Sequence, residues 1–311
     1  MTSRRFATTS LLAALACAPT GGTVAGEPVI RLDEPPGIMV TLRPGESFPH
    51  NIHLYCTGTG SPTVILESGI GASALGWWKV QPPVAASYRT CSYDRAGYGW
   101  SAPGPSGRTV DVLVEELRAA LAGGGVAPPY VLVGHSFGGL IAQHYAATHA
   151  GEVAGLVLVD SSHPRQVNLT SPAVSAGAVH NPVRHVSDFD KSGLPETPEE
   201  IASYLNTRRT AIFTQMDEIK SFGDSAAIMR DEKLPDVPLI VITRGKRAWP
   251  AGAEGDAQEV KWSALQRDLA TAGTHTKHVF ATESGHDIPS EQPDLVSAEI
   301  LALARSLDPA D

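Results

Sequence analysis

Short apolar runs alternate with helical patterns along most of the chain. Apolar or alternating runs predict strands over residues 38–43, 50–56, 62–67, 89–93, 130–134, 155–160, 238–243 and 277–281. Apolar residues at helical spacing predict helices over residues 78–86, 110–122, 137–147, 256–272 and 292–306. Strands that alternate with helices indicate βαβ units. We therefore predict an α/β fold with a mostly parallel, doubly wound sheet of about eight strands.

The alternation of predicted strands and helices is interrupted at residues 162–237. This stretch opens with polar loop residues and then carries helical patterns at 199–205, 208–220 and 226–231. Its apolar side chains are too few for a core of their own. We therefore expect a helical cap inserted after the sixth strand of a single domain, residues 27–311, rather than an independent domain.

The first 26 residues have the layout of an export signal. Arg4 and Arg5 form a basic start, and the apolar stretch at residues 11–16 is far too short to span a membrane. The arginine pair is similar to a twin-arginine signal, which indicates a periplasmic or extracellular protein. Cys17 leaves lipoprotein anchoring open as the less favoured alternative, and a disordered tail is another.

The charge balance restricts the class of partner. The 311 residues include 33 acids and 24 bases, for a net charge of −9 at pH 7. Nucleic-acid sites need clustered lysine and arginine, so we expect no nucleic-acid partner. No histidine pair or cysteine pair has the spacing of a metal site, and no second apolar run could span a bilayer. We expect no metal, no cofactor and no membrane span; the oligomeric state stays unknown.

Two cysteines lie in predicted strands. If the protein is exported, an oxidising compartment permits a bond between Cys56 and Cys91. The alternative is two buried free thiols, and the sequence leaves both open.

A glycine-rich turn with a serine at its centre carries the strongest candidate chemistry. Residues 134–139, GHSFGG, follow an apolar strand and open a helix. Glycines on both sides of Ser136 allow a turn tight enough to expose the hydroxyl group. The N–H groups at the start of the helix point toward negative charge that develops beside the serine. The pattern therefore indicates a nucleophilic serine.

Four segments together resemble the α/β-hydrolase fold family. They are PTVILESGIG, YDRAGYGWS (93–101), VLVGHSFGG and SGHDIPSEQP (284–293), in the family's order. The resemblance covers about residues 38–311 and implies that Ser136 is the nucleophile. It also implies an oxyanion hole built from the backbone N–H groups of Phe137 and Ile70. Ser68-Gly69 stands where the family often has His-Gly. Asp94 and Arg95 match a family motif, and we expect them to brace the loop that leads to Gly99.

The serine needs a base, because a hydroxyl group is a weak nucleophile until its proton is removed. His286 follows the last predicted strand, where the family places its catalytic histidine. We expect His135, next to the nucleophile, to point away from Ser136 and to pack or line the substrate site. His163 is a second candidate for lining the pocket.

The acid of the triad has more than one candidate. Asp160 ends an apolar strand, so we expect it to be partly buried and to need a partner such as an imidazole N–H. The commoner family position follows the next strand, where Asp256 and Glu254 are the available carboxylates. We favour Asp160 and keep Asp256 and Glu254 as alternatives.

These residues predict a serine hydrolase of carboxylic esters that acts on a small-molecule substrate through an acyl-enzyme. The serine disfavours the haloalkane dehalogenases and epoxide hydrolases of the same fold, which place aspartate at this position. An acyltransferase or a carbon–carbon bond hydrolase with the same triad is an alternative. A non-catalytic binding protein of the same fold is a further one. The preference for small or medium acyl groups rests on analogy with the family.

Overall fold

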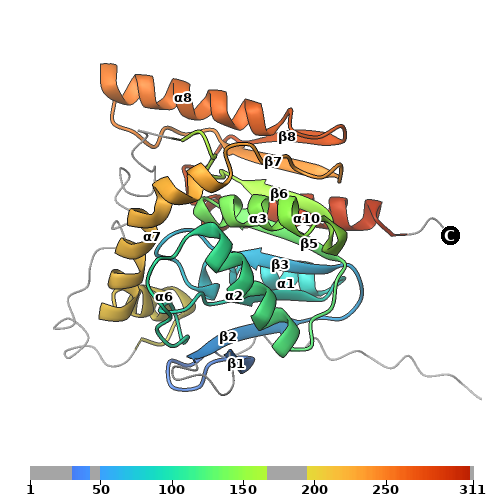
Figure 1. Ribbon diagram of the computed structural model, residues 1–311, viewed down its shortest axis with the longest axis vertical. Coiled ribbons are helices and arrows are strands. Elements are labelled where there is room, and N and C mark those ends of the chain that lie inside the picture. The colour runs from blue at the N-terminus through green and yellow to red at the C-terminus, as the bar shows by residue number, and fades with distance from the viewer. Residues whose placement is uncertain (1–29, 43–49, 167–194, 309–311) are drawn as a thin grey trace, which may run out of the picture.

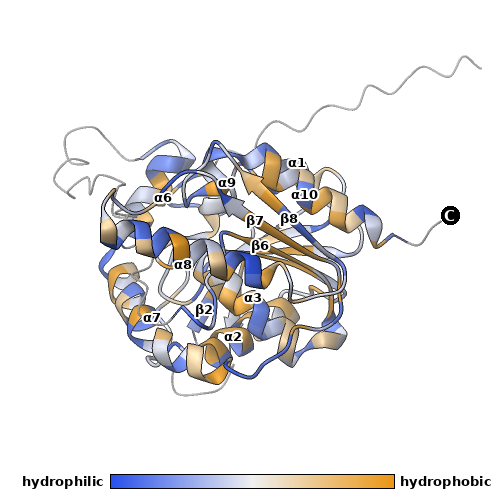
Figure 2. Ribbon diagram, turned by 90° about the horizontal axis from the view of Figure 1, so that it is seen from above, coloured by the Kyte–Doolittle hydropathy of each residue, from blue (hydrophilic) through white to orange (hydrophobic). Residues whose placement is uncertain are grey.

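The computed structural model describes residues 30–42, 50–166 and 195–308. Its centre is one sheet with helices on both faces (Figures 1 and 2). The strands in chain order are β1 (Ile38–Leu42), β2 (His50–Thr57), β3 (Thr63–Glu67), β4 (Thr90–Tyr93), β5 (Tyr130–His135), β6 (Val153–Val159), β7 (Leu239–Arg244) and β8 (Thr276–Ala281). The predicted α/β class with eight strands is confirmed.

The strand order across the sheet is β1-β2-β4-β3-β5-β6-β7-β8. β2 pairs antiparallel with both β1 and β4, and every pair from β4 to β8 is parallel. Parallel neighbours end at the same edge of a sheet. The loops that follow β3, β5, β6, β7 and β8 therefore gather along one edge, which is where open α/β sheets bind their ligands.

Helical segments connect the strands. They are η1 (Ala74–Trp77), α1 (Gln81–Ala85), α2 (Val110–Gly123), α3 (Phe137–Thr148), η2 (Ala150–Glu152), α6 (Pro198–Asn206), α7 (Arg209–Ile228), α8 (Ala253–Leu269), α9 (Ile288–Glu291) and α10 (Pro293–Ser306). Among these described helices, none is long and apolar enough to cross a membrane.

The central strands are apolar on both faces because helices cover both. In β5, Leu132 packs in a cluster with residues of α2 and α3, whereas its neighbours Val131 and Val133 pack with α1 and α10. Figure 2 shows these two helix pairs on opposite sides of the sheet. Side chains alternate between the faces of a strand, so a fully apolar strand serves two hydrophobic layers at once.

Two helix predictions were wrong in detail. The helix expected over residues 78–86 is shorter: residues 78–80 form a turn, and α1 covers only Gln81–Ala85. Pro82 and Pro83 lie in the first turn of α1, where a residue without an N–H group costs no helical hydrogen bond. The two helices expected over 208–220 and 226–231 are one helix, α7. It continues past Gly223, and the buried Ser225 hydroxyl lies within it and accepts the N–H of Val110.

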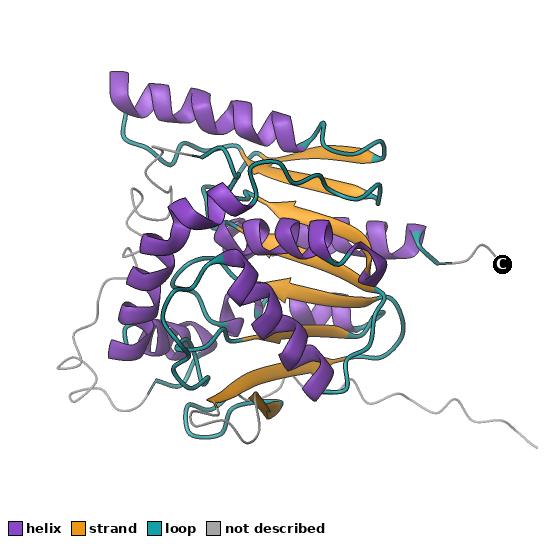
Figure 3. Ribbon diagram, in the orientation of Figure 1, coloured by secondary structure: helices purple, strands orange, loops and turns teal. Residues whose placement is uncertain are grey.

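α6 and α7 lie beside the carboxyl ends of the central strands (Figures 1 and 3). They come between β6 and β7 in the chain, and Ile201 and Leu205 of α6 pack against Leu75 of the main domain. We call α6 and α7 the cap helices. The predicted limits of the cap, 162–237, and of the export signal, 1–26, stay predictions, because residues 1–29 and 167–194 lie outside the described part of the chain.

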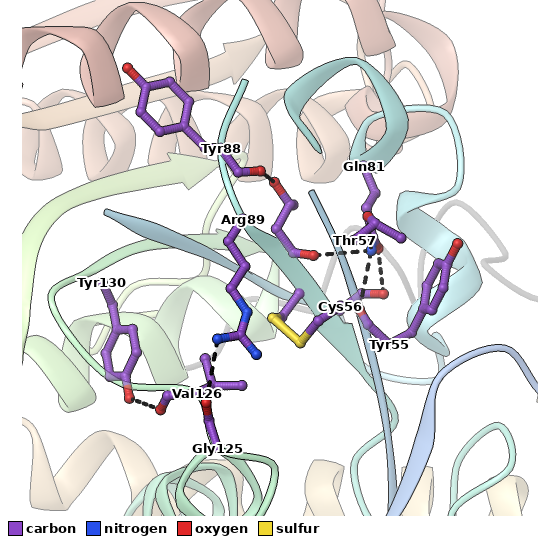
Figure 4. The surroundings of a disulfide bond; sticks show 12 residues. Tyr55, Cys56, Thr57, Gln81, Tyr88, Arg89, Gly125, Val126 and Tyr130 are labelled. Atoms are coloured by element: carbon purple, nitrogen blue, oxygen red, sulfur yellow. Dashed lines mark hydrogen bonds between the residues drawn. A yellow bond between two sulfur atoms is a disulfide. The ribbon is translucent and has the colours of Figure 1, made fainter. Parts of the chain in front are cut away.

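A disulfide joins Cys56 of β2 to Cys91 of β4 (Figure 4). The two residues lie directly opposite each other in the antiparallel pair, with 4.0 Å between their Cα atoms. Cys91 is fully buried against the main core. Of the two alternatives that the sequence left open, the structure has the bonded one.

Reducing this bond is expected to lower the melting temperature by about 5–10 °C, because a cross-link over a 35-residue separation contributes about 2–4 kcal/mol. Thermal unfolding with and without dithiothreitol measures the effect. The double variant Cys56→Ala/Cys91→Ala is the control and should not respond to the reductant. If the melting temperature of the wild type were the same with and without dithiothreitol, this would show that the Cys56–Cys91 bond does not form.

Candidate active site

Ser136 lies on the tight turn between β5 and α3. Its φ angle is +53°, which is uncommon for a residue with a side chain. A Cβ atom on Gly138 would fall 2.4 Å from the backbone oxygen of Glu67, so only glycine fits after the turn. The predicted strand–turn–helix context of the serine is confirmed. Ser136 is nearly buried, with 3% of its surface exposed.

His286 contacts the serine from the loop between β8 and α9. Its Nε2 atom lies 2.9 Å from Ser136 Oγ, and its Nδ1 atom lies 2.6 Å from Asp160 Oδ2. The carboxylate can only accept a proton, so Nδ1–H donates to Asp160 and Nε2 accepts the Ser136 hydroxyl. The structure therefore brings together the three residues that the sequence analysis favoured, over separations of 150 and 126 residues.

Asp160 directly follows β6 and is fully buried. Its φ angle is +39°; among the described residues, Ser136 and Asp160 are the non-glycine residues with positive φ. Such strained backbone is concentrated at functional sites. With this backbone conformation, the Asp160 carboxylate contacts His286 and Arg244.

Other groups keep the Asp160 carboxylate charged. Its Oδ1 atom accepts the indole N–H of Trp262 at 2.9 Å, and its Oδ2 atom accepts the guanidinium of Arg244 at 2.9 Å. Burial by itself would raise the pKa of Asp160, but Arg244, His286 and Trp262 outweigh burial and lower this pKa to about 2. The carboxylate is therefore ionised at every pH at which a histidine base is neutral.

Sequence reasoning missed Arg244 and Trp262. The Arg244 guanidinium is buried against the rings of Trp249 and Trp262, and its other terminal nitrogen bonds Glu259 at 2.9 Å. The ring of Trp262 also meets the His286 ring edge-on, with 5.9 Å between centroids. Arg244 could have been found from the sequence, because it is the last residue of β7, and the ends of β6 and β7 are neighbours in the sheet. Nothing local in the sequence marks Trp262 on α8.

The alternative acids lie elsewhere. Glu254 and Asp256 are exposed in the first turn of α8. Asp256 pairs with Arg247 at 2.7 Å, with more than half of its side-chain surface exposed. Asp160, not these residues, contacts His286.

The two other candidate histidines do not contact the serine hydroxyl. His135 Nε2–H donates to the backbone oxygen of His286 at 2.8 Å, so it supports the loop that carries His286. Burial and the nearby His286 lower the pKa of His135 to about 4. The His135 ring is therefore neutral near pH 7 and adds no charge beside His286. His163 bonds Asp268 on α8 at 3.0 Å.

The loop after β3 lies beside the serine. A Cβ atom on Gly69 would be 3.2 Å from the Cβ atom of Ser136. The backbone N–H groups of Ile70 and Phe137 have no hydrogen-bond acceptor among the described residues. Two unused donors beside a serine can hold a negatively charged oxygen.

Asp94 braces the loop toward Gly99 as expected: it accepts the N–H groups of Ala74 at 2.7 Å and Trp100 at 3.0 Å. Arg95 instead reaches the loop after β3, where it bonds the backbone oxygens of Ser68 and Gly69. In the described part of the chain, no group of three histidine, cysteine, aspartate or glutamate side chains could hold a metal ion.

Residues 62–225, just over half of the chain, match the family model of the alpha/beta hydrolase fold. The uncharacterized protein YqjL of Bacillus subtilis (strain 168) is 26% identical over 243 residues, which cover 78% of this chain and 83% of that protein. Matches to two further uncharacterized proteins, C23C11.06c of Schizosaccharomyces pombe and YbdG of Bacillus subtilis, span 28% and 36% of their lengths.

Solved structures share the fold. An enol-lactonase from Burkholderia xenovorans LB400 has a TM-score of 0.60 at 19% identity and covers 82% of this chain and 96% of its own. A thermophilic esterase from Thermogutta terrifontis has a TM-score of 0.60 at 20% identity and covers 88% of this chain and 99% of its own.

Proposed function

Because the chain belongs to the alpha/beta hydrolase fold family, we propose that it hydrolyses carboxylic esters with Ser136, His286 and Asp160 as its catalytic residues. The observation that carries the proposal is the pair of hydrogen bonds through His286, at 2.9 Å to Ser136 and 2.6 Å to Asp160. This is the arrangement in which a base activates a serine and an acid orients the base.

The proposed reaction begins with the proton of Ser136. His286 Nε2 accepts this proton while Ser136 Oγ attacks the carbonyl carbon of the ester. Asp160 accepts a hydrogen bond from Nδ1–H of His286, which leaves Nε2 unprotonated and able to accept the serine proton. The Asp160 charge also stabilises the imidazolium that forms.

The carbonyl oxygen becomes negatively charged as the carbon becomes tetrahedral. The N–H groups of Ile70 and Phe137 are the proposed donors to this oxygen. When the intermediate collapses, the ester C–O bond breaks and His286 gives its proton to the leaving alcohol. The acyl group stays on Ser136 until water, deprotonated by His286, attacks it. The bond between the acyl carbon and Ser136 Oγ then breaks, and His286 returns its proton to this oxygen, which gives a carboxylic acid and the free serine.

The identity of the nucleophile favours acyl transfer over alkyl transfer. A serine forms an acyl ester that water can hydrolyse, whereas dehalogenases and epoxide hydrolases of this fold use aspartate to form an alkyl ester. Two proteins of similar fold are called an enol-lactonase and an esterase, and a lactone is a cyclic ester. These names agree with a carboxylic ester as the substrate class.

A series of nitrophenyl esters of increasing acyl length tests the proposal. We expect turnover that peaks at short or medium acyl chains and exceeds that of Ser136→Ala by at least about 10³-fold. The variant gives the background rate for each ester. Wild-type rates equal to this background for every ester would overturn the proposal.

We also propose that the protein is exported. Two features support export: the basic and apolar pattern of residues 1–26, and the Cys56–Cys91 bond, which persists in oxidising compartments. Fractionation of bacterial cells that express the full chain tests this. Esterase activity confined to the cytoplasm in wild type, and unchanged in Arg4→Lys/Arg5→Lys, would contradict export.

A further inference from the structure

We propose that Glu218 of the cap helix α7 positions the oxyanion loop, defined as residues 68–71, by holding Arg95 and Tyr98 against it. The inference rests on the proposed function, because it concerns the donor that Ile70 would give to the reacting ester. It makes Glu218 a positioning residue that does not itself touch the substrate.

Arg95 is the buried centre of the arrangement, with all five of its N–H bonds in use. One terminal nitrogen bonds the backbone oxygen of Ser68 and the carboxylate of Glu67, both at 2.6 Å. The other bonds the backbone oxygen of Gly69 at 2.9 Å and Glu218 at 3.1 Å. Its Nε–H bonds Glu218 at 2.8 Å. The Arg95 guanidinium therefore donates hydrogen bonds to two consecutive carbonyl groups of the oxyanion loop and to the Glu218 carboxylate of the cap.

Tyr98 ties the far end of the loop to the same carboxylate. Its hydroxyl group donates to Glu218 at 2.9 Å and accepts the N–H of Gly71 at 3.2 Å. Ile70 lies between the Arg95 anchors and this Tyr98 anchor. Its N–H direction is therefore set by groups that all bond Glu218.

Glu218 is unusual for its helix. Met216 and Ile219 of α7 are exposed, yet Glu218 is fully buried. A buried charge is unfavourable unless it is paired. Among the described residues, the partners of Glu218 are Arg95, Tyr98 and, at 3.7 Å, Arg108, and all three lie on the main domain. Burial raises the pKa of Glu67 to about 7, so near pH 7 Glu67 carries only part of a negative charge. The Glu218 carboxylate supplies further negative charge beside Arg95, with which it forms an ion pair at 2.8 Å.

Removing the Glu218 charge should loosen Arg95 and hence the oxyanion loop. A donor that misses the developing oxyanion weakens transition-state binding and leaves substrate binding largely intact. A residue that only docked the cap would change thermal stability or KM instead. The division of the effect between kcat and KM therefore separates the two roles.

The test compares Glu218→Gln with Asp217→Asn in the full chain, using the best nitrophenyl ester of the series. Asp217 is the adjacent residue of α7 and bonds the N–H of Gly107 at 2.9 Å, so it controls for loss of a cap-to-domain contact. We expect Glu218→Gln to lose about 10–100-fold in kcat with KM within about twofold, and Asp217→Asn to match wild type. The active-site concentration is counted by fluorophosphonate titration.

Tyr98→Phe keeps the test decisive if Glu218→Gln does not fold, because it removes only the hydroxyl group between Glu218 and Gly71. We expect about a 3–10-fold loss in kcat. Wild-type kcat per active site in whichever of these variants folds would overturn the inference and leave the esterase proposal intact. A wild-type protein without activity on any ester would instead overturn the proposed function.

Discussion

Asp160→Asn is expected to lower kcat for ester hydrolysis by about 10⁴-fold. The asparagine would present an N–H₂ group or a neutral oxygen to His286 Nδ1, now 2.6 Å from a carboxylate. An N–H₂ group forces the proton of the imidazole onto Nε2, where it can no longer accept the Ser136 hydroxyl proton. A neutral oxygen keeps the tautomer but loses the charge that stabilises the imidazolium. Steady-state kinetics with the preferred nitrophenyl ester measures the loss.

Asp256→Asn is the matched control, since it makes the same chemical change at the alternative acid. Asp256 is exposed and pairs with Arg247, so we expect its kcat within about twofold of wild type. Near-normal turnover in Asp160→Asn, or a large loss in Asp256→Asn, would show that the acid is assigned wrongly. Melting temperatures of both variants separate a catalytic loss from unfolding.

Ser136→Ala is expected to lower kcat by about 10⁵–10⁶-fold. No covalent intermediate can form without the hydroxyl, and the remaining rate reflects only binding and the N–H donors of Ile70 and Phe137. The protein should stay folded, because alanine removes one oxygen from the turn. Progress curves at high enzyme concentration measure the residual rate.

Ser297→Ala is the control for this variant. Ser297 is also buried, but its hydroxyl bonds the backbone oxygen of Pro293 within α10. We expect wild-type kcat for it. A Ser136→Ala protein that retains more than about a hundredth of wild-type turnover would mean that another group performs the attack.

The nucleophile and the base could be predicted because their signals are local. The turn around Ser136 needs glycines at fixed spacing, and His286 lies in the short loop that follows β8, the last strand of the sheet. The sheet itself could be predicted because β3, β5, β6 and β7 each contain a run of apolar residues. The acid needed the structure, since the ends of β6 and β7 are neighbours and both loops carry carboxylates.

The rest of the site depends on contacts between distant segments, which leave no local pattern. Trp262 bonds Asp160 over a separation of 102 residues, and Glu218 bonds Arg95 over 123. Arg95 illustrates the difference. Its motif predicted a brace for the loop toward Gly99, whereas its side chain holds the oxyanion loop. Only the folded arrangement shows which carbonyls and carboxylates a buried guanidinium meets.

Covalent labelling by a fluorophosphonate tests most directly the central claim that Ser136 is an activated nucleophile. We expect the folded wild-type chain to gain one phosphonyl group, and peptide mass spectrometry to place it on Ser136. His286→Ala should label at least about 100-fold more slowly, because the serine loses its base. A folded wild-type protein that does not label, or that labels at another residue, would contradict the account.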